Sequence, residues 1–364
     1  MGEKHVTADV GSAAVAEAGP GGVDVAALPD GFVPLRIKRV ISETRDAVSI
    51  VLDVPTGSVE LFGYHAGQFL TLLVSVDGSE HRRCYPMSSA PGLGEDLQIT
   101  VKRDRDGLVS NWLNDRAAPG DQLLALPPQG RFVLHDSDRE LIAFAGGSGI
   151  TPVFSLLRTA LVSGKRTARL FYANRSRDAV IFDESLASLN ARHADRFVLH
   201  HHLDDNSGFV TPADIQAFVR DAGDADVYIC GPNEFMETVR TALSASGVPA
   251  DRVHVEHFDV NDIAAAAPPG TDVVTNEVTI VLDGVTTTAP YDPGNTLLQT
   301  ARMAGLRAPS SCEIGSCGTC MARLTQGSAR MINNDALEPD EVEEGWVLTC
   351  QALPTSSTVR VVYE

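Results

Sequence analysis

The segment Cys312-Glu313-Ile314-Gly315-Ser316-Cys317-Gly318-Thr319-Cys320 places three cysteines on one short loop, and Cys350 follows after a further 29 residues. This spacing is typical of a two-iron, two-sulfide cluster. Gly315 and Gly318 allow the backbone to wrap closely, and the fourth thiolate arrives from a distant strand end. A structural zinc site is the alternative, and it is disfavoured because such sites combine two short Cys or His pairs.

The residues around this loop predict a small domain over 273–364. VTIVLDGVTTTAP reads as a hairpin, TLLQTARMAG as a helix and VRVVYE as a final strand. The domain contains 11 acidic and 5 basic residues, a net charge of −6, with Glu338, Asp340, Glu341, Glu343 and Glu344 concentrated before Cys350. Residues 261–272 are rich in Pro, Ala and Gly and read as a linker.

Residues 138–260 alternate between strand and helix patterns. ELIAFAGG, ARLFYANRS, FVLHHHLDD and DVYICGP have strand character, and helical patterns separate them. Such alternation predicts an α/β domain with a parallel sheet.

Residues 32–137 contain short strand patterns separated by Gly, Pro and Asp, from PLRIKRVISE to LQITVKRD. Their length and frequency predict an antiparallel Greek-key β-barrel. Residues 1–31 contain no aromatic residue, and they read as a disordered tail.

The formal net charge of −19 makes nucleic acid and anionic membranes improbable partners. No apolar run reaches the roughly 18 residues that a membrane span needs, and the first ten residues lack the apolar core of a signal peptide. We therefore expect a cytoplasmic protein. We also expect it to be a monomer.

Four further motifs occur in a fixed order: Arg83-Cys84-Tyr85-Pro86-Met87-Ser88-Ser89, Gly107-Leu108-Val109-Ser110, Gly147-Ser148-Gly149-Ile150-Thr151-Pro152 and Cys230-Gly231-Pro232. Together with the cysteine loop they resemble the ferredoxin–NADP reductase superfamily. The resemblance implies three domains in order: a flavin barrel, a nicotinamide domain and a C-terminal β-grasp domain that resembles plant-type ferredoxins. This order is similar to that of the reductase components of multicomponent oxygenases, in particular those that serve phenylacetyl-CoA or ketosteroid hydroxylases.

The resemblance implies FAD in the barrel, NADH or NADPH in the α/β domain and a [2Fe–2S] cluster on Cys312, Cys317, Cys320 and Cys350. It also implies a set of cofactor-binding residues: Arg83, Tyr85, Pro86, Ser88, Ser89, Val101, Lys102, Gly107, Val109, Ser110, Gly147, Ser148, Gly149, Thr151, Pro152, Arg175, Ser176, Arg177, Cys230, Gly231 and Pro232. A guanidinium such as Arg83 can neutralise phosphate, and the Gly107–Ser110 helix start suits a pyrophosphate, which favours FAD over FMN.

The resemblance assigns catalytic roles to Cys230, Ser88 and Phe258. Cys230 corresponds to a cysteine that lies against the nicotinamide, and Phe258 to an aromatic residue that covers the flavin. Pro86 stands where the family has a serine near flavin N5, and proline offers neither a hydroxyl nor an N–H group. Ser88 or Ser89 would then supply that contact. Buried core roles for Cys230 and Phe258 are the alternatives.

Arg175, Ser176 and Arg177 could bind the 2′-phosphate of NADPH or form a solvated turn, and NADH is favoured because many reductases of this layout use it. We expect electrons to pass from NAD(P)H through FAD and the cluster to a terminal oxygenase with a basic docking face. A reductase for a desaturase or a cytochrome P450, and a stand-alone flavin oxidoreductase, are the alternatives.

Overall fold

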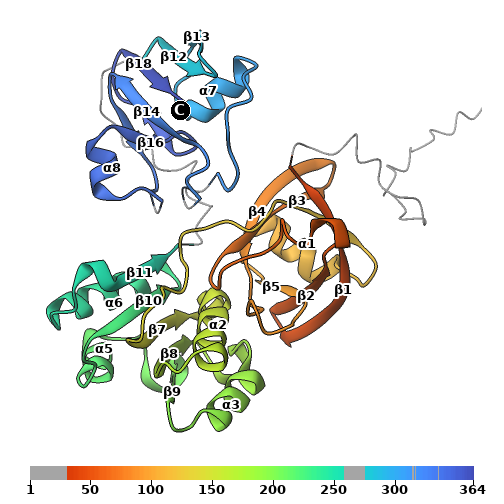
Figure 1. Ribbon diagram of the computed structural model, residues 1–364, viewed down its shortest axis with the longest axis vertical. Coiled ribbons are helices and arrows are strands. Elements are labelled where there is room, and N and C mark those ends of the chain that lie inside the picture. The colour runs from red at the N-terminus through yellow and green to blue at the C-terminus, as the bar shows by residue number, and fades with distance from the viewer. Residues whose placement is uncertain (1–30, 258–274, 314, 316, 335) are drawn as a thin grey trace, which may run out of the picture.

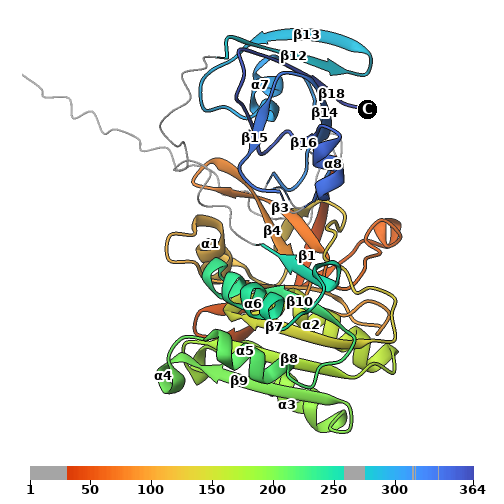
Figure 2. The same ribbon diagram turned by 90° about the vertical axis from the view of Figure 1, so that its left-hand side faces the viewer.

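The computed structural model describes residues 31–257, 275–313, 315, 317–334 and 336–364. The predicted tail (apart from Gly31), the linker over 261–272 and Phe258 lie outside these residues. The described chain forms three units, and the colours of Figures 1 and 2 follow them along the chain: the barrel is mainly red to orange, the parallel-sheet unit mainly green and the cysteine-bearing unit blue.

The first unit is a six-stranded antiparallel sheet in the order β4-β3-β6-β1-β2-β5. A bridge between Met87 and Ile99 joins the two ends of this order and closes the barrel. Strands β1 to β5 match the predicted strand patterns. The short β6 was not predicted, because its four residues QLLA are too few to show an alternating pattern. The elements are β1 Val33–Thr44, β2 Ala47–Asp53, η2 Thr56–Ser58, β3 Phe69–Val76, β4 Ser79–Pro86, β5 Leu97–Lys102, α1 Leu108–Arg116 and β6 Gln122–Ala125.

The second unit is a five-stranded parallel sheet in the order β11-β10-β7-β8-β9. The predicted alternation of strands and helices is confirmed. Its elements are β7 Glu140–Gly146, η3 Gly147–Gly149, α2 Ile150–Arg158, η4 Thr159–Ser163, β8 Ala168–Asn174, η5 Arg177–Ala179, α3 Asp183–Arg192, β9 Phe197–Leu203, α4 Asp204–Ser207, α5 Pro212–Val219, β10 Ala225–Cys230, α6 Asn233–Ala245, η6 Ala250–Arg252 and β11 Val253–Glu256.

Two apolar cores cover the two faces of this parallel sheet. Leu156 of α2 and Leu186 of α3 pack on one face, while Ile215 of α5 and Val239 of α6 pack on the other. The chain order reverses between β7 and β10, the two neighbouring central strands. In open α/β sheets, ligands bind at the carboxyl ends of strands at such a switch point.

The third unit has a mixed five-stranded sheet, β13-β12-β18-β14-β16, with α7 packed against it and a small β15-β17 ladder. β12 and β18 run parallel, as a β-grasp arrangement requires. Its elements are β12 Glu277–Leu282, β13 Val285–Pro290, α7 Leu297–Met303, β14 Met321–Gln326, β15 Ala329–Met331, α8 Pro339–Glu343, β16 Trp346–Leu348, β17 Ala352–Pro354 and β18 Thr358–Val362.

Candidate functional site: a relay of three cofactor positions

Strand β4 presents different residues on its two faces. Successive side chains of a strand point to opposite sides, so Arg83 and Tyr85 share one face and Arg82 and Cys84 share the other. Tyr85 packs against the barrel core, and burial raises the pKa of its hydroxyl. Arg83 donates one hydrogen bond to the Arg82 carbonyl at 2.7 Å. Pro86 is buried at the strand end.

The two serines after β4 are both buried. Ser88 Oγ lies 2.8 Å from Thr100 Oγ1 and accepts from Gln98 Nε2 at 3.0 Å. Ser89 Oγ lies 2.7 Å from Tyr64 Oη and accepts from the Gln98 amide. Both hydroxyls therefore hold the barrel together in this arrangement, and a contact from either serine to the flavin remains a prediction.

The Gly107–Ser110 motif begins helix α1, as predicted. Gly107 is the N-cap residue, and a Cβ atom added there would lie 2.2 Å from Ser110 Oγ. Ser110 Oγ accepts from the Asp104 amide at 3.2 Å and donates to the Gly107 carbonyl. Val109 is buried in the barrel core. The motif thus fixes a helix start, where free N–H groups suit a pyrophosphate.

The glycine loop and the Cys230 motif meet at the switch point of the parallel sheet. A Cβ atom on Gly149 would lie 2.1 Å from the Cys230 carbonyl oxygen, and one on Gly231 would lie 2.9 Å from the Gly146 nitrogen. Only glycine permits this approach of two backbones. Thr151 Oγ1 donates to the Ser148 carbonyl at 2.9 Å, and this closes the turn into α2.

A cation from the barrel reaches the same loop. Lys102, the last residue of β5, has its Nζ atom 3.1 Å from the position of a Cβ on Gly147. Burial lowers the pKa of Lys102, and the charge of Arg175 lowers it further. Lys102 and Arg175 therefore place positive charge beside the loop, where a bound dinucleotide phosphate would be stabilised.

Cys230 is fully buried at the end of β10, and burial, with a contribution from Glu256, raises the pKa of its thiol well above the usual value. Glu256 pairs with Cys230 in the β10–β11 register and is 5% exposed. Our sequence reasoning missed Glu256. The signal that could have found it is an acidic residue at the end of the short strand Val253–Glu256, two positions before Phe258.

The segment after β8 surrounds its basic residues with acids. Arg177 pairs with Asp183 at 2.7 Å, and Ser176 Oγ hydrogen-bonds Asp178. Arg175 is exposed. A 2′-phosphate at this position would face two carboxylates that already hold Ser176 and Arg177.

The four cysteines predicted to hold the cluster lie in one region of the third unit and approach one another as two pairs. The Cys317 thiol is hydrogen-bonded with Cys312, which lowers the pKa of Cys317 to about 6, and Cys320 is paired with Cys350 in the same way, which lowers the pKa of Cys320. The Thr319 amide donates to Cys317 Sγ at 3.4 Å. Gly315 adopts φ +91° and lies close to the Asn333 carbonyl, as the predicted tight loop requires.

This pairing fits a [2Fe–2S] cluster. Each iron shares two sulfides and has two positions left for thiolates, which Cys312 with Cys317 and Cys320 with Cys350 would fill. Within the described part of the chain, no three His, Cys, Asp or Glu side chains group around a single ion position. A mononuclear zinc site would need all four thiolates around one ion, whereas two cysteine pairs match two irons.

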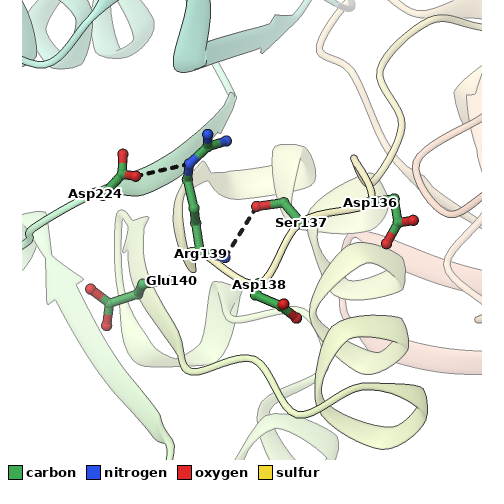
Figure 3. Close-up of a pocket in the computed structure, with 6 residues that line it drawn as sticks. All are labelled: Asp136, Ser137, Asp138, Arg139, Glu140 and Asp224. Atoms are coloured by element: carbon green, nitrogen blue, oxygen red, sulfur yellow. Dashed lines mark hydrogen bonds and ion pairs between the residues drawn. The ribbon is translucent and has the colours of Figure 1, made fainter.

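An open pocket lies apart from these positions (Figure 3). It is lined by Asp136, Ser137, Asp138, Arg139, Glu140 and Asp224, at the amino ends of β7 and β10. Arg139 Nε donates to Asp224 at 3.1 Å, and the Arg139 amide donates to Ser137 Oγ. Because the glycine loop lies at the opposite ends of these strands, this acidic pocket is separate from the nucleotide site.

Comparison with known proteins gives the same three units. A model for the oxidoreductase FAD-binding domain matches residues 33–134, one for the oxidoreductase NAD-binding domain matches 143–241, and one for the 2Fe-2S iron-sulfur cluster binding domain matches 280–355. In the described residues, no helix is long and apolar enough to cross a membrane.

Several relatives match almost their full length. The ferredoxin reductase component of 3-ketosteroid-9-alpha-monooxygenase from Mycolicibacterium smegmatis is 38% identical, over 91% of this chain and 96% of that protein. A subunit of the 1,2-phenylacetyl-CoA epoxidase from Escherichia coli is 32% identical, over 92% and 98% respectively.

The solved structure of phthalate dioxygenase reductase superposes with a TM-score of 0.61 at 28% identity, covering 92% of this chain and 98% of that one. The cofactors FAD, NAD(H) and a [2Fe–2S] cluster follow from the three matched domains. The chain is an NAD(P)H-dependent flavin iron–sulfur oxidoreductase that belongs to the family of reductase components which supply electrons to a partner oxygenase.

Proposed function

We propose that this reductase oxidises NADH in preference to NADPH and serves an oxygenase whose docking face is basic, with a ketosteroid-type monooxygenase as the first candidate acceptor. The relatives in ketosteroid oxidation, 36–38% identical over nearly their whole length, support this candidate. A cytoplasmic location and a monomeric state belong to the same proposal.

The bound cofactors supply hydride acceptance from NADH at the flavin and one-electron transfer at the cluster. The chain supplies the positions. Arg83 and the start of α1 would hold FAD phosphates, and the Gly147–Pro152 loop would hold the nicotinamide dinucleotide. Cys230 would lie against the nicotinamide, Phe258 would cover the flavin, and the four cysteines would hold the cluster. The boundaries 32–137, 138–260 and 273–364 are part of this assignment.

The preference for NADH rests on the acids after β8. Asp178 and Asp183 already engage Ser176 and Arg177, and they would repel a 2′-phosphate. A ribose 2′-hydroxyl carries no such charge and can hydrogen-bond to a carboxylate.

The basic acceptor face rests on α8, the observation that carries the docking proposal. Asp340, Glu343 and Glu344 are exposed on this helix or at its end. Glu341 is partly committed elsewhere, because it caps α8 through the Glu338 amide and pairs with Arg131 of the barrel at 3.4 Å. Opposite charge accelerates transient encounters at low salt by one or more orders of magnitude.

The test compares electron transfer to the purified oxygenase component at low and physiological ionic strength. Glu343→Gln with Glu344→Gln should flatten the salt dependence, whereas Glu234→Gln with Glu237→Gln, on exposed positions of α6, should not. NADH-to-ferricyanide activity should stay unchanged in both. A salt-independent rate in the parent protein would contradict electrostatic docking.

The alternative acceptors are distinguished in the same assay. Transfer to a cytochrome P450 or a desaturase but not to an oxygenase component would replace the proposed partner. Rapid reduction of a quinone without any protein acceptor would favour a stand-alone flavin oxidoreductase.

A further inference from the structure

Three successive residues of the cluster loop each contact a different side chain of the flavin barrel. Ser311 Oγ hydrogen-bonds Gln129 Oε1. The Cys312 carbonyl lies 3.9 Å from Cys84 Sγ, and Cys312 packs with Phe69 in a small apolar cluster. Glu313 Oε1 pairs with Arg82 Nη1 at 3.2 Å. The loop that would bear three of the cluster ligands is therefore in direct contact with the barrel.

Glu313 connects this contact to the rest of its own unit. Its carboxylate also pairs with Arg302 of α7 at 2.6 Å, and its carbonyl accepts from Gln351 Nε2 at 2.7 Å. Gln351 directly follows Cys350. One residue thus links the barrel, helix α7 and the segment that carries the fourth ligand.

Arg82 is equally well placed on the barrel. It precedes Arg83 on β4 and points to the opposite face, and its guanidinium lies over the Phe32 ring at 5.4 Å from the centroid. Arg82 and Glu313 are both about two-thirds buried, so water screens this pair less than an ordinary surface pair. The more exposed Arg131–Glu341 pair adds a second ionic contact between the same two units.

We propose that Arg82, Gln129 and Arg131 form an interdomain clamp on Glu313, Ser311 and Glu341, and that Arg82 acts through Glu313 as a positioning residue for electron transfer from flavin to cluster. Strand β4 then serves both cofactors, with Arg83 and Tyr85 toward the flavin and Arg82 and Cys84 toward the cluster loop. The clamp concerns only transfer inside this chain, so it holds whichever acceptor follows.

The electron balance is simple. Hydride from NADH would bring two electrons to FAD, and the cluster would accept one of them by reduction of one ferric ion to ferrous. The second electron could follow only after the acceptor protein has oxidised the cluster, so the acceptor is the one further reactant. Transfer requires close approach of donor and acceptor, which the clamp maintains.

Cys84 provides a direct readout of this contact. It lies at the interface and is half-buried, whereas Cys230 is fully buried and the other four cysteines would be cluster ligands. Alkylation of Cys84 in the intact holoprotein therefore reports how often the two units separate, provided that closing is fast relative to alkylation. Iodoacetamide is the probe, and mass spectrometry identifies the modified peptide.

The test uses Arg82→Gln alone and a triple variant, Arg82→Gln, Gln129→Ala and Arg131→Gln. Loss of one such contact raises the fraction of molecules in which the two units are separated about fivefold. Three independent losses multiply to roughly 100-fold. We expect Cys84 alkylation to accelerate accordingly. In the triple variant, stopped-flow reduction of the cluster should also slow at least about tenfold, while flavin reduction by NADH and the iron and FAD contents stay unchanged.

The matched control is Lys38→Gln, which breaks the exposed Lys38–Asp96 pair, 2.9 Å long, elsewhere on the barrel. It should change neither readout. Unchanged Cys84 alkylation and cluster reduction in the triple variant would overturn the clamp. Faster alkylation with an unchanged cluster reduction rate would overturn the positioning role of Arg82.

Discussion

Cys84 Sγ lies 3.9 Å from the backbone carbonyl oxygen of Cys312, and this contact joins a flavin-barrel strand to a cluster-bearing loop 228 residues further along the chain. Cys84 stands between Arg83 and Tyr85, the two residues expected to contact FAD. The strand that carries the flavin motif is therefore in direct contact with Cys312, the first of the predicted cluster ligands. Burial raises the pKa of the Cys84 thiol to about 12, so it stays protonated at neutral pH.

Removal of the fourth cluster ligand should separate the two redox functions. Cys350→Ser is expected to abolish the two-iron content but to spare NADH-to-ferricyanide activity, because the flavin lies in another unit. Iron analysis and visible absorption measure the first effect. Cys84→Ser is the control and should retain full iron; a full two-iron content in Cys350→Ser would refute the ligand assignment.

Loss of the Cys230 side chain should slow flavin reduction while leaving FAD content intact. The Cys230 backbone closes against Gly149 at the switch point, where the nicotinamide is expected. A displaced nicotinamide reacts more slowly, here by roughly tenfold or more. Anaerobic stopped-flow with NADH gives the rate. A rate equal to that of the parent protein would make Cys230 a core residue only.

Removal of the Arg83 guanidinium should lower FAD occupancy, since phosphate charge would then be less well neutralised. We expect Arg83→Ala to purify with a reduced flavin-to-protein absorbance ratio. Lys38→Ala, on the same barrel but exposed, serves as the control. Full loading of Arg83→Ala with FAD would count against the phosphate role.

Coenzyme preference should shift when the acids near β8 are neutralised. Asp183→Asn frees Arg177, and the KM for NADPH is expected to fall about fivefold, the effect of one exposed charge pair. The KM for NADH should change little. Asp195→Asn, exposed at the opposite end of the sheet, is the control, and an unchanged KM for NADPH in Asp183→Asn would argue against this subsite.

His254 should make the protein sensitive to acid. Burial and the stacked His135, at 4.3 Å between ring centroids, lower the pKa of His254 to about 4. The unfolded chain binds this proton below about pH 6.5 and the folded chain does not. The contribution of His254 to the free energy of unfolding is therefore fully present above about pH 6.5, and it is lost as the pH falls toward 4.

The melting temperature of the holoprotein at pH 7 and pH 5 measures this effect. We expect His254→Gln to show a smaller loss between the two values than the parent protein. An equal loss in both proteins would show that His254 does not titrate in this window. His193→Gln, on the same unit, is the control.

The sequence was enough to predict the three units, which the matched family models confirm, and to assign four cysteines as iron ligands, which stays a prediction. Periodicity separates the barrel from the α/β unit, because a strand repeats every two residues and a helix every 3.6. The spacing of Cys312, Cys317 and Cys320 is a local property, since one loop must reach both irons. Gly149 was also readable from its motif, and the structure gives its reason in the close approach of the Cys230 carbonyl.

Tertiary structure alone decided which residues far apart in sequence meet. Neither the pairing of Arg82 with Glu313 nor the burial of Glu256 beside Cys230 has a local pattern, because each depends on how separately folded units or strands pack. The acidic run before Cys350 shows the same division. Its charge was visible in the sequence, but only packing pairs Glu341 with Arg131 and leaves Glu343 and Glu344 exposed. The reason is that the solvent access of a side chain depends on neighbours that are distant from it in the sequence.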